Sequence, residues 1–389
     1  MMPVPAADHV QPLANQRALF DVPDDVAYFN TASLAPQLHE VRAAGERALG
    51  QRARPWTIAA EDWFSDVERL RAAFAELVGS DADGVALVPA TSYGFAIAAH
   101  NLPLERGDRV LVLAEEYPSG IYTWRAATRP VGAEVLTVTR ERGQSWTEAI
   151  LDQFDERVKI VSVPNVHWTD GALVDLHAIA SRVHQLDARL VIDGSQSIGA
   201  MPLDICRLRP DFVVTVGYKW LLGPFAVGYL YVAPQHRNGR PIEHNWILRA
   251  GAEDFARLVD YREDYQPGAR RFDVGERTKF ELTPMAIAAL EQIHAWGVAR
   301  IALTLAPTTD DIARRARNIG LEPLPDDQRA AHMLGVRLPG RARERVLAAL
   351  ADVNCFASVR GASLRLAPHL HTTAGDVERL FAGLHSVLS

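Results

Sequence analysis

One lysine of this chain stands between two aromatic residues, where a hydrophobic run ends. Lys219 is the next-to-last residue of the run "DFVVTVGYKW" (211–220), which the turn "LLGP" follows. A cation in such a position needs an exit to solvent, a carboxylate partner or a role as a neutral amine. A neutral lysine amine is a nucleophile that bonds to carbonyl compounds. Lys219 is therefore the first candidate for chemistry.

Other polar and aromatic side chains also stand where predicted strands end. In open α/β sheets, ligands bind beyond the carboxyl ends of the strands. The side chains there are hydroxyls, aromatic rings, an acid and an amide: Thr91, Ser92, Tyr117, His167, Trp168, Asp193, Gln196 and Tyr218. Together with Lys219, this set suits a flat, anionic, nitrogen-containing ligand that is attached to an amine.

The strands that position these residues are seven short apolar runs. They cover residues 84–90, 109–117, 133–139, 159–166, 189–196, 211–219 and 227–233. Most are continuously hydrophobic, as in strands covered on both faces, and helical patterns separate them. This alternation predicts an α/β fold, a three-layer α/β/α domain around a mostly parallel seven-stranded sheet. Because only a short turn separates the last two runs, the last strand is expected to be antiparallel.

The rest of the chain predicts two further parts. We expect an N-terminal arm at 1–30, a large domain at 31–280 and a smaller α+β domain at 281–389. One helical stretch from Gln37 to about Val78 precedes the first strand. The small domain is predicted to hold a helix near 284–298, a helix in "RARERVLAALADV", two strands in "CFASVRGASLRLAP" and a helix from about Gly375.

Composition excludes several classes of protein. The 389 residues carry a net charge of −7, which gives no electrostatic footprint for nucleic acid or an anionic membrane. No stretch is apolar for the roughly 18 residues that a membrane helix needs, and the N-terminus does not resemble a signal peptide. Two cysteines, Cys206 and Cys355, do not make a disulfide framework, so a reducing cytoplasm is expected.

A long central stretch resembles a known enzyme family. It reads "VIDGSQSIGAMPLDICRLRPDFVVTVGYKWLLGPFAVGYLYV" and is similar to the core of the fold-type I pyridoxal 5'-phosphate enzymes. More narrowly, it resembles the class V aminotransferase family of cysteine desulfurases, kynureninases and isopenicillin N epimerase-like proteins. Its strongest part is Asp193-x-x-Gln196, followed 26 residues after the Asp by Lys219. The resemblance runs from "YFNTASLAP" (28–36) to "LRLAPHLHTTAGDVERL" (364–380).

The resemblance implies roles around the cofactor ring. Lys219 would hold pyridoxal 5'-phosphate as a Schiff base, and burial would favour its neutral amine. Asp193 would face the pyridine nitrogen and keep it protonated, so that the ring draws in electrons from the substrate Cα. Gln196 would donate to the ring phenolate oxygen. Tyr117, in "EEYPS", would stack on the ring, with plain packing as the alternative.

The phosphate end is assigned to residues that open a helix. Thr91 and Ser92, in "PATSYG", would hold the phosphate at the helix N-terminus, or act as an ordinary cap. Tyr218 matches the aromatic residue or histidine that reaches the phosphate. Thr278, in "GERTKFELTP", lies where the family often sends a loop to the neighbouring subunit's phosphate, although the usual Gly-Thr-Pro wording is absent.

Some positions depart from the desulfurase pattern. Val216 stands where desulfurases place a serine, three residues before the lysine, so one phosphate hydroxyl is missing. Trp168 replaces their asparagine, which leaves its contact with the cofactor ring open. His167 is a candidate base or substrate contact, with a buried structural histidine as the alternative.

The substrate side of the site is assigned to arginines. Arg365 matches the family's C-terminal arginine that grips the substrate α-carboxylate, and a planar guanidinium suits that bidentate task. Arg360 is an alternative or a salt-bridge partner. His369 and His371 have no Cys or acid companions in the sequence, so no metal site is expected.

The cofactor fixes carbanion chemistry at Cα but leaves the outcome open. A persulfide-forming desulfurase is disfavoured, because neither Cys206 nor Cys355 is expected at a mobile position near the site. Wording such as "GYKWLLGP" is closest to the isopenicillin N epimerase-like subgroup, which predicts a lyase or epimerase. A class V aminotransferase is the alternative, and a non-catalytic binding member is a remote one. The family also implies a small amino-acid substrate and a homodimer.

Overall fold

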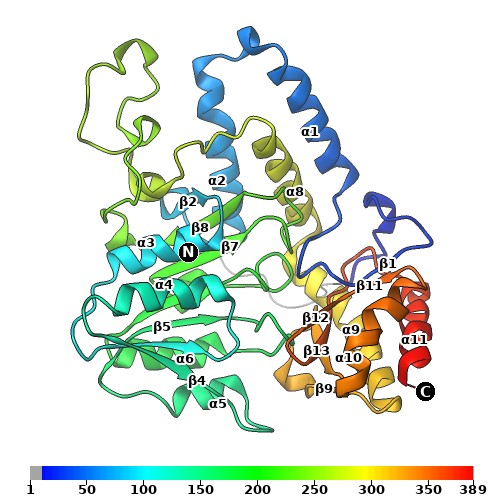
Figure 1. Cartoon of the computed structure of the whole chain (residues 1–389). Coiled ribbons are helices and arrows are strands. Elements are labelled where there is room, and N and C mark those ends of the chain that lie inside the picture. The colour runs from blue at the N-terminus through cyan, green and yellow to red at the C-terminus, as the bar shows by residue number, and fades with distance from the viewer. Residues whose placement is uncertain (1–10, 389) are drawn as a thin grey trace.

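A seven-stranded sheet lies at the centre of the computed structural model, which describes residues 11–388 (Figure 1). Its strand order is β2-β8-β7-β6-β5-β3-β4. The strands are β2 (Val85–Val88), β3 (Arg109–Leu113), β4 (Glu134–Val138), β5 (Val158–Pro164), β6 (Arg189–Asp193), β7 (Phe212–Val216) and β8 (Gly228–Val232). β8 is antiparallel to both of its neighbours, and the other paired strands are parallel. The predicted sheet and its antiparallel last strand are thus confirmed.

Helices cover the sheet on both faces, as its continuously apolar strands require. In β3, Val110 and Val112 face one side, while Leu111 and Leu113 belong to the core on the other side. Figure 1 shows α3 (Thr91–Asn101) and α4 (Pro118–Thr128) side by side on the first face. The second face is covered by α2 (Ser65–Leu77), α5 (Trp146–Leu151), α6 (Leu176–Gln185) and α8 (Leu282–Trp296). The single-turn α7 (Ile205–Leu208) joins β6 to β7.

The predicted helix from Gln37 to Val78 is broken into two. α1 (His39–Arg52) and α2 are separated by residues 53–64, which contain two short 3-10 turns. Pro55 begins the first of these turns. Proline lacks an N–H and disfavours helical geometry in the residue before it, so the break falls here. None of the helices within residues 11–388 is long and apolar enough to cross a membrane.

A second, smaller unit surrounds a four-stranded antiparallel sheet of order β12-β13-β10-β9. Its elements are β9 (Glu322–Pro323), β10 (Leu334–Arg337), α10 (Gly340–Ala351), β12 (Ser358–Arg360), β13 (Ser363–Leu366) and α11 (Ala374–Leu388). The end of the predicted N-terminal arm packs on this unit, where β1 (Ala27–Tyr28) pairs with β11 (Cys355–Phe356), while residues 1–10 of the arm lie outside the described residues. Ala27 and Phe29 belong to the core of the small unit.

A long helix that the sequence did not predict joins the two units. α9 (Val298–Asn318) follows α8 after Gly297, whose φ of 77° is favourable for glycine. Pro307 lies inside α9 and gives the sequence "LAPTTDD" the character of a turn. Leu305 belongs to the core of the large unit and Ile312 to that of the small one. The proposed domain boundary near 281 stays a prediction, since α8 and the first half of α9 pack with the large sheet.

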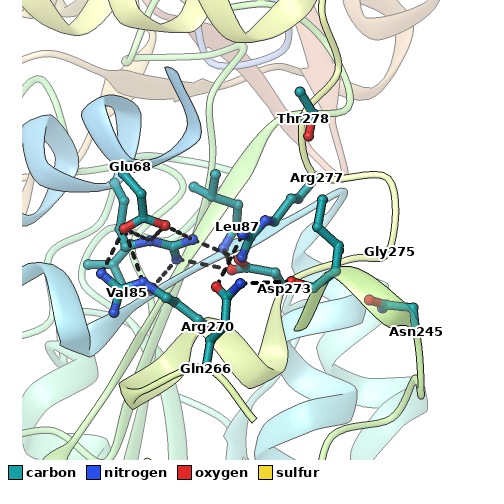
Figure 2. A network of polar contacts seen from close by, with 12 residues as sticks. Glu68, Val85, Leu87, Asn245, Gln266, Arg270, Asp273, Gly275, Arg277 and Thr278 are labelled. Atoms are coloured by element: carbon teal, nitrogen blue, oxygen red, sulfur yellow. Dashed lines mark hydrogen bonds and ion pairs between the residues drawn. The ribbon is translucent and has the colours of Figure 1, made fainter. Parts of the chain in front are cut away.

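A buried ion network fastens residues 266–278 to the large unit (Figure 2). Asp273 Oδ2 accepts hydrogen bonds from Arg71 Nη2 and Arg277 Nη1, both at 2.7 Å. Its Oδ1 accepts from the backbone N–H of Leu87 in β2, also at 2.7 Å. The charges of Arg71 and Arg277 outweigh burial and keep the pKa of Asp273 low. The loop that precedes this network stands away from the sheet at the upper left of Figure 1.

Candidate active site

A small cavity lies at the carboxyl ends of the central strands, where ligands bind in open α/β sheets. Its walls come from the segments that follow β2, β3, β5, β6 and β7, and from Val216 at the end of β7. The lining residues are Thr91, Glu116, Tyr117, Pro164, Val166, Trp168, Asp193, Ser195, Gln196, Val216, Tyr218 and Lys219. Seven of the residues singled out from the sequence therefore meet in one place.

Lys219 is buried in this cavity, with 8% of its surface exposed. Its Nζ lies 5.5 Å from the ring centre of Tyr117 and 5.9 Å from that of Tyr218. No ion pair joins it to a carboxylate within residues 11–388. Burial lowers the pKa of Lys219 to about 8, against the opposing charge of Asp193. Of the three roles open to this lysine, the structure favours the neutral amine.

Asp193 and Gln196 are held in one buried turn after β6. Asp193 Oδ1 accepts a hydrogen bond from the N–H of Ser195 at 2.8 Å, and burial raises the pKa of Asp193. Gln196 is fixed at both ends of its amide. Its Oε1 accepts from Trp220 Nε1 at 2.9 Å, and its Nε2 donates to the carbonyl of Ala32 at 3.0 Å. Because Trp220 directly follows Lys219, this hydrogen bond links the segment that carries Lys219 to the turn that carries Gln196.

Aromatic rings form one wall of the cavity. Tyr117 meets Trp168 edge to face, with ring centres 5.6 Å apart. The only N–H of the Trp168 side chain donates to the carbonyl of Glu115 at 2.7 Å. Trp168 therefore supplies an apolar surface, and its donor is already used. Tyr218 packs against Phe225, which is 67% exposed.

The start of α3 offers free backbone donors. The N-cap residue is Ala90, whose side chain makes no capping hydrogen bond. Thr91 and Ser92 lie inside the first turn, so neither is an ordinary cap. Thr91 is buried and lines the cavity, whereas Ser92 is exposed and does not. Uncapped N–H groups at a helix N-terminus bind anions such as phosphate.

Arg365, on β13 of the small unit, lies next to the cavity, because it contacts Trp168 of the cavity wall. It is 1% exposed, and its Nη1 donates to the carbonyl of Trp168 at 2.9 Å. Its Nη2 lies 3.4 Å from Asn30 Oδ1, and its buried Nε has no hydrogen-bond partner among the described residues. Burial, with a smaller effect of Arg360, lowers the pKa of Arg365 to about 9. Arg360 lies over the ring of Trp168, 5.8 Å from its centre.

Five predicted residues do not line the cavity: Ser92, His167, Thr278, Arg360 and Arg365. Two of them, His167 and Thr278, are held by other contacts. The ring of His167 is held by Thr169 Oγ1 at 2.8 Å and the carbonyl of Ala114 at 3.1 Å, and it stacks on Trp146. This is the arrangement of the structural alternative, so the geometry does not support the prediction of a substrate contact. Thr278 is buried, and its Oγ1 donates to the carbonyl of Trp63 at 2.8 Å. Within its own chain it does not reach the cavity.

Among the lining residues that the sequence analysis missed, Glu116 is the one with an ionisable side chain. Its Oε1 accepts from the N–H of Tyr117 at 2.7 Å, and its buried Oε2 has no partner in the described chain. Burial raises the pKa of Glu116 to about 7, although the charge of His167 lowers it. The signal was present in the sequence, since Glu116 lies beside Tyr117 at the end of the strand predicted at 109–117.

The residues present fit pyridoxal 5'-phosphate. A buried amine, a buried acid in the same cavity, an aromatic wall and an uncapped helix N-terminus are the groups that an aldehyde-bearing, phosphorylated pyridine needs. Lys219 would hold the aldehyde carbon, Asp193 the ring nitrogen and Thr91 with the α3 N–H groups the phosphate.

Comparisons with known proteins agree with this site. The sequence model described as Aminotransferase class-V matches residues 32–361. A kynureninase of Deinococcus radiodurans is 29% identical over 98% of this chain and 95% of its own length. An isopenicillin N epimerase of Streptomyces clavuligerus is 25% identical over 96% of this chain and 97% of its own length.

The fold also matches solved structures. A variant of C-DES with glycine covalently linked to its PLP cofactor superposes with a TM-score of 0.86 at 18% sequence identity, over 96% of this chain and 99% of that one. The family match covers most of the described sequence, and the cavity has the residues that the cofactor requires. The chain therefore belongs to the class V aminotransferase family and is a pyridoxal 5'-phosphate-dependent enzyme.

Proposed function

We propose that this enzyme acts at the Cα of an amino acid as a lyase or epimerase of the isopenicillin N epimerase-like subgroup. The observation that carries action at Cα is the occurrence of a buried amine of lowered pKa, Lys219, together with a buried arginine, Arg365, that forms no ion pair with a carboxylate within residues 11–388. Similarity to an isopenicillin N epimerase over nearly the whole length supports the subgroup.

The residues divide the work between binding and proton transfer. When bound, the cofactor supplies an electron sink for a carbanion at Cα. Arg365 holds the α-carboxylate, and Asp193 keeps a proton at the pyridine nitrogen. Lys219, whose amine is buried beside the site, would be the base that moves the proton at Cα. Tyr117 and Trp168 cover the site and exclude water.

A class V aminotransferase remains the alternative, because the same residues serve transamination. A desulfurase that carries persulfide on its own cysteine is disfavoured by the positions of Cys206 and Cys355. Cys355 is buried in β11, where burial raises the pKa of its thiol to about 12. Cys206 is exposed, and its Sγ donates to the carbonyl of Gly79. Neither lines the cavity. A non-catalytic binding role is remote with Lys219, Asp193 and Gln196 in place.

A homodimer is part of the proposal. Large apolar side chains are exposed on the described chain, including Trp56 at 80% and Tyr261 at 92%. Exposed aromatic residues favour a protein interface, and the simplest closed assembly is a two-fold dimer. Thr278 then stays a candidate for contact with the partner's cofactor. The expected cytoplasmic location also stays a prediction.

The first experiment identifies the amine. The chain has three lysines, Lys159, Lys219 and Lys279. Borohydride reduction of the cofactor-loaded protein, followed by peptide mapping, is expected to place the cofactor on Lys219 alone. Lys219→Ala should lose the visible absorption band. A label on either other lysine would overturn the proposal.

The second experiment separates the reactions. The loaded enzyme is mixed with L- and D-amino acids, including L-kynurenine, in deuterated buffer. A lyase releases product without an added keto acid, and an epimerase exchanges the Cα proton and inverts the substrate. If turnover appears only after a keto-acid acceptor is added, the lyase and epimerase proposal is wrong and the aminotransferase alternative holds.

A further inference from the structure

Two arginines of the small sheet lie on the same side of it, beside the cavity. β12 and β13 are antiparallel, with Ser358 opposite Arg365. Residues 358 and 360 of one strand share a face, so Arg360 and Arg365 share it too. Both guanidinium groups lie against Trp168, one bonded to its carbonyl and the other over its ring.

Neither arginine forms an ion pair with a carboxylate within residues 11–388. The contrast with other buried arginines is sharp. Arg71 and Arg277 are 0% and 2% exposed, and both pair with Asp273. Arg329, at 4%, pairs with Asp310 and Asp326. Arg365 is as buried as these three and lacks the acid that each of them has.

The two positive charges also act on each other and on the lysine. Arg360 contributes to the lowered pKa of Arg365, and both arginines contribute to the lowered pKa of Lys219. Holding like charges together is unfavourable unless a ligand with more than one negative group offsets it.

We propose that the substrate is an amino acid with a second carboxylate on its side chain, bound by Arg360 while Arg365 holds the α-carboxylate. This inference rests on the proposed function of the same site. Diagonal neighbours on antiparallel strands are about 7 Å apart, which suits the two acidic groups of one short molecule. A planar guanidinium gives each carboxylate two parallel hydrogen bonds.

The test compares acids with amides of the same shape. L-Aspartate and L-asparagine, and L-glutamate and L-glutamine, are titrated into the cofactor-loaded enzyme while the visible absorption is followed. We expect each acid to bind roughly tenfold or more tightly than its amide, as a charge-assisted hydrogen bond predicts. Arg360→Gln should reduce that preference to about twofold or less, whereas Arg360→Lys, which keeps the charge, should retain part of it.

Two further variants serve as references. Arg365→Gln should weaken acids and amides alike, since both carry the α-carboxylate. Arg337→Gln removes an exposed arginine from β10 of the same sheet and should change nothing. The absorption band and the thermal unfolding of each variant report whether it has folded.

The outcomes separate this inference from the proposed function. If the acids bind no better than the amides, or do not bind, or if Arg360→Gln keeps the preference, the second-carboxylate inference is wrong. The proposed function is judged independently by cofactor labelling of Lys219 and by turnover of any amino acid in the wider panel.

Discussion

The reactivity of Lys219 comes from its surroundings. Three lysines occur in the chain, and Lys159 is exposed on β5 while Lys219 and Lys279 are withdrawn from solvent. Burial lowers the pKa of Lys219 and of Lys279 to about 8 each. Lys279 donates to the carbonyl of Ala226 and does not line the cavity. Low basicity alone is therefore not the signature of the site. What sets Lys219 apart is that it lines the same cavity as Asp193.

Cofactor attachment should follow the titration of Lys219. The amine is charged below its pKa and nucleophilic above it, so the attachment rate of added cofactor to the apoprotein should rise with pH, with a midpoint near 8. The visible band measures the rate. Lys279→Met, which removes the other buried amine, should leave the profile unchanged. A midpoint above 10 would show that the cavity does not lower the basicity of Lys219.

Glu116 should make the apoprotein less stable at alkaline pH. Its pKa is raised to about 7 in the folded state from 4.5, so the folded protein holds an extra proton between these values, and stability falls as pH rises through that window. At pH 8 the cost is up to about 3 kcal/mol. Glu116→Gln should therefore raise the thermal unfolding temperature at pH 8 and change little near pH 4.

Glu115→Gln provides the matched control for this prediction, because Glu115 is the exposed neighbour of Glu116. It should have no effect at either pH. An equal gain from both variants would mean that the change reflects the net charge of the protein and not the buried carboxyl.

At the scale of elements, the sequence predicted the large sheet well because most of its strands are buried on both faces, the edge strand β4 being the exception. Such strands read as continuous apolar runs, and all seven were found. α9 was missed because the proline and polar residues of "LAPTTDD" are typical of a turn. The helix is nevertheless continuous, because it packs against the cores of both units. The break between α1 and α2 was missed for a related reason, as Pro55 was given too little weight.

The site was predicted where one side chain at a strand end carries the chemistry, as with Asp193 and Lys219. It was not predicted where contacts between residues far apart in the sequence decide whether a side chain lies at the site. His167 and Trp168 are neighbours at one strand end, yet only Trp168 lines the cavity while His167 turns toward Trp146. His332 was not suspected at all, because its contact with the site joins residues 136 apart in the sequence.

His332 fastens the small unit to the turn that holds Asp193 and Gln196. It is fully buried, its Nε2 lies 2.6 Å from the carbonyl of Gln196, and its ring meets Trp220 edge to face. His332→Leu leaves that buried carbonyl without a donor, which costs about 1–3 kcal/mol. We expect lower thermal stability together with weaker cofactor binding in a fluorescence titration.

His332→Gln is the rescue variant, since its amide restores a hydrogen-bond donor near the position of Nε2. It should recover most of the cofactor affinity. His371→Gln alters another buried histidine that does not touch Gln196. If His332→Leu lowers stability but binds the cofactor as tightly as the unaltered enzyme, His332 does not position the turn.

At the scale of the whole molecule, distant segments depend on one buried carboxylate. Asp273 lies in the chain that returns from the outer loop, Arg71 in α2 and Leu87 in β2, so the network joins three parts of the large unit (Figure 2). Its buried charged groups are two arginines, Arg71 and Arg277, and one acid, Asp273. A further negative charge comes from Glu68, which accepts hydrogen bonds from Arg71 and Arg270. This network holds the loop end against the edge strand of the sheet that carries the site.

Replacing Asp273 should therefore loosen the large unit as a whole. Asp273→Asn keeps the size but leaves Arg71 and Arg277 buried without a counter-charge, and breaking such a pair costs about 3–5 kcal/mol. The exposed pair of Arg47 and Glu40 has a similar distance of 2.6 Å, yet Glu40→Gln should cost less than about 1 kcal/mol. Urea unfolding measures both. Because the pKa of Asp273 is lowered in the folded state, its contribution is present above about pH 4 and is lost as the pH falls further. Equal losses in the two variants at neutral pH would mean that burial does not decide the strength of this network.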